Sequence, residues 1–204
     1  MEENTNYIQQ EEPTEAPSSS TPTEGTTTQD PKVVRENNVK EATDSINNLN
    51  NKIQTEIEAE QLYVDKTKEY QSLLNQYADE AEKAGDIEAA KKYREQSASY
   101  QGEIDKAEKE ITENKKEIED NNKITESFKD NNVTNKAIQE ANKKAKQQTE
   151  DKYGEKDGKK NSEAAKTEDY NNKSDDMINK VDELYEEAAS GNRLSTDELK
   201  KRNL

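Results

Sequence analysis

The chain has 204 residues, a net charge of −16 at pH 7 and a mean hydropathy of −1.50. Leu, Ile, Val and Phe together account for 26 of the 204 residues, about 13%, well below the roughly 20% expected of a compact globular chain. The absence of Cys, His and Trp excludes disulfides, thiol and imidazole catalysis and nearly every zinc or transition-metal site, so we expect no enzymatic activity and no cofactor.

The strong negative charge also limits the partners. Phosphate binding needs basic patches, so we expect no direct contact with nucleic acid. No apolar run approaches the roughly 18 residues of a membrane span, and the N-terminus lacks the basic start and apolar core of a secretory signal. These features predict synthesis in a cytoplasm and no membrane-spanning segment.

Residues 1–36 are predicted to form an acidic, Pro/Ser/Thr-rich flexible arm. The first 31 residues contain seven acids, all four prolines and no Lys or Arg. Such a composition cannot bury enough apolar surface to offset the entropy lost on ordering.

Residues 37–130 carry a heptad pattern, which predicts two long amphipathic helices. The first stripe consists of Ile46, Leu49, Ile53, Glu56, Glu60, Tyr63, Thr67, Tyr70, Leu74, Tyr77, Ala81 and Ala84. The second consists of Ala90, Tyr93, Ser97, Tyr100, Ile104, Ala107, Ile111, Asn114, Ile118, Asn121, Thr125 and Phe128. Gly85 supplies a left-handed residue that ends the first helix, and Asp86 caps the second. We therefore predict a long antiparallel coiled-coil helical hairpin with its turn at 85–86, closed either within one chain or across a dimer.

The polar seam positions Glu56, Glu60, Asn114 and Asn121 either specify register or leave room for a further helix, and we favour the second interpretation. The five tyrosines of the two stripes have two readings as well: packing in the seam, or an adhesive tip for a partner.

The stretch AGDIEAAKKYREQS, which contains this turn, resembles the inter-helix turn of a tetratricopeptide repeat in the placing of Gly85, Asp86, Ala90, Tyr93 and Ser97. The resemblance covers about 14 residues, and no second copy occurs at a period near 34. It implies a tight turn between helices rather than a peptide-binding solenoid.

Residues 131–190 are predicted to form two further helices joined by a Gly/Lys-rich loop at 153–161. An EF-hand reading of this loop fails, because it would place Tyr153 and Ala164 where calcium ligands are required. The second of these helices could fill the gap left by the polar layers of the hairpin.

Residues 191–204 are predicted to form a short capped helix. Ser195 and Glu198 are spaced as a capping box, and Leu194 and Leu199 as a hydrophobic staple. This helix either docks on its own protein or binds a partner. In the second case the partner-binding residues are Leu194, Leu199, Lys200, Lys201, Arg202 and Leu204.

Taken together, these features predict an all-α structural protein that spaces or docks protein partners, and its helices offer a surface for forming a homo-oligomer. In overall character the chain resembles scaffolding or minor structural proteins of tailed bacterial viruses, which implies a place in a virion or an assembly intermediate. The alternative is a secreted bacterial coiled-coil adaptor or effector, with the N-terminal arm as its export segment.

Overall fold

A computed structural model describes residues 30–190 of the chain. Helices make up most of these residues, so the prediction of a mostly helical protein is confirmed. The elements are α1 (Pro31–Lys83), α2 (Ile87–Ser99), α3 (Gln101–Ser127), α4 (Asn135–Tyr153), β1 (Glu155–Lys156), β2 (Lys159–Lys160) and α5 (Ser162–Ser190).

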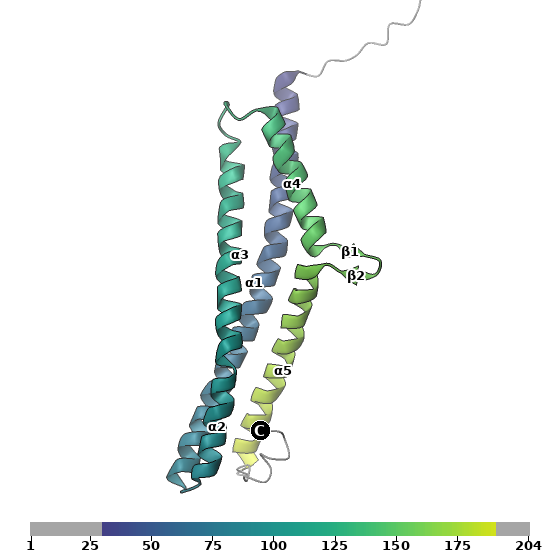
Figure 1. Ribbon diagram of the computed structural model, residues 1–204. Coiled ribbons are helices and arrows are strands. Elements are labelled where there is room, and N and C mark those ends of the chain that lie inside the picture. Colours follow the sequence, from purple (N-terminus) through teal and green to yellow (C-terminus); the bar gives the residue numbers. More distant parts are fainter. Residues whose placement is uncertain (1–29, 191–204) are drawn as a thin grey trace, which may run out of the picture.

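The described part of the molecule is a long rod in which α1 is the central element (Figure 1). Helices α2 and α3 return along α1 in the opposite direction, and α4 and α5 follow one another down its other side. All four of these helices pack on α1, whereas α4 and α5 touch each other only where they meet. With 53 residues at about 1.5 Å per residue, α1 is roughly 80 Å long.

Helix α1 begins at Pro31, inside the segment 1–36 predicted as an arm. The carboxylate of Asp30 accepts a hydrogen bond from the backbone nitrogen of Lys32 at 2.8 Å. Proline is favoured at the first helical position because its missing N–H would have no partner there. The dipeptide Asp30-Pro31 therefore starts the helix before the heptad pattern becomes visible.

The chain reverses direction at Gly85 and Asp86. Gly85 has φ of +83°, in the left-handed region where a residue with a Cβ is strained. The Asp86 carboxylate accepts a hydrogen bond from the backbone nitrogen of Ala89 at 3.0 Å and so caps α2. The predicted second helix is divided at Tyr100 into α2, which ends at Ser99, and α3, which begins at Gln101. The backbone of Tyr100 itself stays right-handed (φ −83°, ψ −13°).

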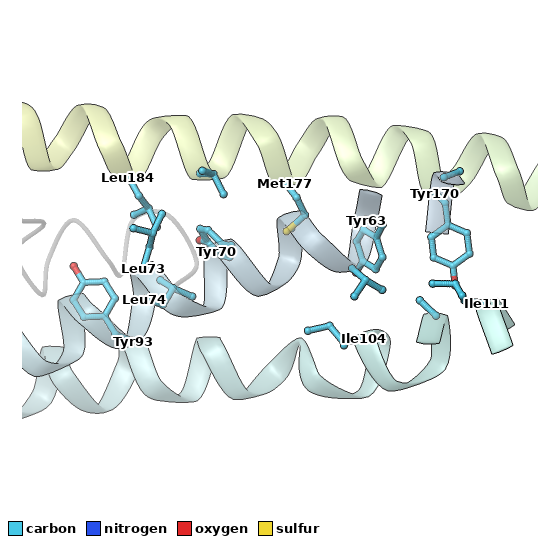
Figure 2. Close-up of a cluster of buried hydrophobic side chains, with 14 of the residues drawn as sticks. Tyr63, Tyr70, Leu73, Leu74, Tyr93, Ile104, Ile111, Tyr170, Met177 and Leu184 are labelled. Carbon is cyan, nitrogen blue, oxygen red and sulfur yellow. The ribbon is translucent and has the colours of Figure 1, made fainter. Parts of the chain in front are cut away.

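The main core runs along the rod between α1 and the helices that flank it (Figure 2). Tyr63 and Tyr70 of α1 lie in this core, and their rings pack on Tyr170 of α5 at 5.5 Å and on Tyr100 at 5.6 Å between ring centroids. Met177 and Leu184 continue the α5 side of the core. The tyrosine rings therefore contribute apolar area between helices, as in the seam-packing interpretation.

A second, smaller core lies at the end of the rod away from the turn at Gly85 and Asp86, where α4 packs on α1. It contains the buried side chains Ala42, Ile46, Phe128, Ile138 and Ala145. The guanidinium of Arg35 donates hydrogen bonds to the carbonyl oxygens of Val133, Phe128 (3.2 Å) and Asp130 (2.9 Å). These bonds fix the α3–α4 turn beside the start of α1.

The segment predicted as a loop at 153–161 contains a short β-hairpin that projects sideways between α4 and α5 (Figure 1). Its strands β1 and β2 pair antiparallel, and the turn residues Asp157 and Gly158 both have positive φ, 53° and 71°. Asp-Gly is a strong signal for a two-residue hairpin turn because it tolerates this conformation. The sequence therefore contained evidence for the hairpin beyond the loop that we predicted.

Candidate functional site

The predicted site residues fall into two groups. The turn residues Gly85 and Asp86 lie at one end of the rod, with the exposed side chain of Ile87 beside them. The predicted partner-binding residues Leu194, Leu199, Lys200, Lys201, Arg202 and Leu204 lie outside the described residues.

A group of charged side chains inside the middle of the rod forms the most unusual feature, which we call the interior Glu–Lys cluster. It consists of Glu56, Glu60, Glu110, Glu163 and Lys166. Glu56 and Glu60 have no exposed surface. The ammonium of Lys166 is 2.8 Å from a carboxylate oxygen of Glu56, 2.8 Å from Glu163, 3.7 Å from Glu110 and 3.9 Å from Glu60. One cation thus faces four carboxyl groups contributed by three helices.

Two tyrosines close the cluster. The Tyr153 hydroxyl donates to Glu56 at 2.7 Å, and the Tyr170 hydroxyl donates to Glu110 at 2.8 Å. The amide of Asn114 lies 3.4 Å from Glu60. Buried carboxylates are tolerated only when such partners replace the water that they lose.

The pKa of Glu60 is strongly perturbed. Burial is the largest cause and the negative charge of Glu56 the next; together, against the opposing effect of Lys166, they raise it from 4.5 to about 8. A hydrogen bond with Glu110 also favours the protonated form. Glu60 is therefore mostly protonated at neutral pH.

The pKa values of Lys166 and Glu163 shift in the directions that favour their charged forms. Burial tends to lower the pKa of Lys166, but hydrogen bonds to Glu163 and Glu56 outweigh it, so this pKa lies above its usual range. Burial tends to raise the pKa of Glu163, but the hydrogen bond from Lys166 outweighs it, and the net pKa falls below 4.5. Lys166 and Glu163 therefore remain an ion pair near pH 7.

The cluster holds helices together. Glu56 and Glu60 come from α1, Glu110 from α3, and Glu163 with Lys166 from the first turns of α5. Since Glu60 has no exposed surface, a substrate molecule cannot reach its carboxyl group in this conformation. Within residues 30–190, no three acidic side chains are arranged so that they could hold a metal ion.

Sequence reasoning identified Glu56 and Glu60 as polar seam positions but missed Lys166, Glu110 and Glu163. The available signal was indirect: two adjacent buried acids on one stripe require a cation from another helix. Lys166 lies in the second of the two helices predicted within residues 131–190. Its pairing with α1 depends on how the helices are aligned, which no local pattern specifies.

The β-hairpin carries the lysines Lys156, Lys159 and Lys160, which are exposed. Lys160 pairs with Glu168 of α5 at 2.9 Å. The base of the hairpin is fixed by Asn161, whose side-chain amide donates to the carbonyl oxygen of Glu150 at 2.7 Å. The hairpin is thus a small projection with three exposed lysines, anchored at its base to an acidic rod.

In the part of the chain that the structure describes, no helix has the length and apolarity needed to cross a membrane. Comparisons of the chain with protein-family models, with curated proteins and with solved structures give no match.

Proposed function

We propose that this protein is a non-enzymatic structural component that spaces or docks other proteins. The observation that carries the proposal is the continuous 53-residue helix α1, packed by the other four helices. A helix of this length supported by neighbours on its sides resists bending and holds a fixed distance of roughly 80 Å.

The distribution of buried side chains supports a spacing role. The two hydrophobic cores and the interior Glu–Lys cluster follow one another along α1. Because a thin rod has little interior at any level, its stability must come from many short layers rather than from one large core. Such a molecule offers a long surface for protein contacts.

The two ends and the side of the rod offer distinct docking surfaces. Ile87 is 63% exposed beside the turn at 85–86, and the predicted partner-binding helix 191–204 follows α5, which ends at the same end of the rod. The lysines of the β-hairpin project from the middle. Different partners can therefore bind at separate positions along one molecule.

Two biological settings fit this proposal. An assembly scaffold or minor structural protein of a bacterial virus should co-purify with capsid or tail protein. A secreted adaptor or effector is favoured by the Ser/Thr-rich composition of residues 1–31; in that case, fusing residues 1–31 to a reporter should cause its export.

Site-specific photo-crosslinking in a native lysate tests the spacing role. A photoreactive amino acid replaces Ile87 at one end, Asn131 at the other, or the exposed Lys109 in the middle as a control. We expect different proteins to be captured from the two ends and little capture from Lys109. The same capture at all three positions would contradict the spacing role.

A deletion of residues 192–204 tests the docking helix separately. The deleted protein should keep its helical content and lose the partner captured at Ile87. Unchanged capture there would show that this helix does not dock the partner.

A further inference from the structure

An open groove lies between α3 and α4, at the end of the rod where α1 begins. Its volume is about 530 Å³. Ile46, Ala141 and Ala145 contribute apolar side chains to it, and Ile124 on α3 remains 39% exposed. An exposed isoleucine beside other apolar side chains forms an apolar patch, and burying this patch under a further apolar group would be favourable.

The α4 side of this groove is basic. Helix α4 contains five lysines against three acids, although the whole chain has a net charge of −16. Lys143, Lys144 and Lys146 are exposed and make no ion pair with any residue between 30 and 190. Lys144 lines the groove, while Lys143 and Lys146 line a second open hollow along α4, together with Gln139 and Asn142.

The α3 side of the groove is acidic, but its acids already have partners. Glu117 pairs with Lys152 at 2.7 Å and Glu113 with Lys109 at 3.7 Å. Asp120 is 3.2 Å from Lys123, which also pairs with Glu119 at 2.8 Å. The groove lining itself is balanced in charge, with three acids and three lysines, and the excess positive charge lies beside it on α4, at Lys143, Lys144 and Lys146. The surface fits a short segment that combines one or two apolar side chains with several carboxylates.

We propose that the segment Tyr7–Glu15 of the same chain binds this surface. Residues 1–29 contain six glutamates and no Lys or Arg. Three of the glutamates, Glu11, Glu12 and Glu15, follow closely after Tyr7 and Ile8, which are the largest apolar residues in that range. Tyr7 and Ile8 cover Ile124 and the alanines of α4, and the three carboxylates lie on Lys143, Lys144 and Lys146.

The connection to α1 has the right position and length for this contact. Arg35 holds the α3–α4 turn against α1, so the chain before Pro31 leaves beside the start of α4. Ser45 of α1 and Asn142 of α4 are hydrogen bonded at 2.7 Å. Lys143, Lys144 and Lys146 therefore lie near the level of Ser45, which is 14 residues after Pro31 and so roughly 20 Å from it along α1.

Glu15 and Glu11 are 16 and 20 residues from Pro31 along the chain. Random-coil chains of 16 to 20 residues have a root-mean-square span of about 20–25 Å, close to the distance required. The tether then gives an effective concentration in the millimolar range, at which even weak charge pairs produce a populated complex. This inference does not depend on the proposed spacing function.

Paramagnetic broadening in the full-length protein tests the proposal directly. Because the chain contains no Cys, a Gln10→Cys variant accepts one nitroxide label, and the amide signals of α3 and α4 report its position. We expect the strongest broadening at residues 119–125 and 139–148. Replacing Glu11, Glu12 and Glu15 by Gln should lower the ratio of docked to free arm by about tenfold.

Matched controls separate charge complementarity from general charge effects. Replacing Glu2, Glu3 and Glu24 by Gln changes the net charge equally and should leave the broadening in place. On the rod, the triple change of Lys143, Lys144 and Lys146 to Gln should remove it, and the same change at Lys52, Lys83 and Lys115 should not.

Three results would overturn the proposal. The first is broadening that is the same in all variants, as for an arm that does not dock. The second is broadening centred elsewhere on the rod. The third is broadening that passes from a labelled copy to an unlabelled, isotopically enriched copy in a mixed sample, which would make the occupant a second molecule.

Discussion

Replacing Glu60 by Gln is expected to remove a pH dependence of stability that the native protein shows between about pH 5 and pH 8. Burial and the charge of Glu56 raise the pKa of Glu60 from 4.5 to about 8 in the folded protein. In this pH range the folded state holds a proton that the unfolded state has released. The free energy of unfolding therefore falls as the pH rises.

The expected magnitude follows from the size of the shift. One bound proton changes the free energy of unfolding by about 1.4 kcal/mol per pH unit. Between the two pKa values of Glu60, 4.5 and about 8, the sum is on the order of 5 kcal/mol, a large part of the stability of a typical domain. Glutamine is neutral at every pH and retains a donor toward Glu110, so the variant should be the more stable protein near pH 8.

The other groups with shifted pKa values change the stability only outside the range from about pH 5 to pH 8. The lowered pKa of Glu163 gives stability that is lost only as the pH falls below about 4.5. The raised pKa values of Lys166 and of the buried tyrosines give stability that is lost only above their ordinary values of 10.5 and 10.0. The chain contains no His, so Glu60 should dominate between pH 5 and 8.

Urea unfolding followed by far-ultraviolet circular dichroism at a series of pH values measures this effect. A control variant, Glu95→Gln, makes the same change in net charge at an exposed position in an ion pair with Lys91 and should retain the native slope. A flat curve for the native protein, or a slope that survives in Glu60→Gln, would refute the assignment of the proton to Glu60.

Three further predictions concern single side chains. Lys166→Met keeps the apolar stem but leaves the carboxylates without their cation, so we expect a loss of about 3 kcal/mol in urea unfolding; a loss below the measurement error would contradict the cluster. Tyr153→Phe removes the hydroxyl that donates to Glu56 and should cost about 1 kcal/mol, a value that a native-like unfolding midpoint would exclude. Gly85→Ala forces a Cβ into φ +83° and should destabilise by about 1 kcal/mol, whereas Gly102→Ala, at a helical position with open space, should stabilise by roughly 0.5–1 kcal/mol; the same sign for both would refute the role of the turn.

The sequence predicted features that depend on neighbouring residues. The heptad stripes predicted the first two helices, Gly85 and Asp86 predicted the turn between them, and the glycines at 154 and 158 predicted the loop between the two further helices. These signals are local because helix periodicity, capping and positive φ are decided within a few residues. The Asp30-Pro31 start of α1 and the Asp157-Gly158 hairpin turn were also readable, since both depend on dipeptide chemistry.

Only the tertiary structure decided what the polar seam positions contact and which surfaces stay open. Glu56 and Glu60 face Lys166 because α5 lies at that level of α1, more than 100 residues later in the chain. The groove beside Ile124 exists because α3 and α4 each pack on α1 and scarcely on each other. Such alignments depend on summed packing energies between distant segments, which a pattern along one segment does not contain.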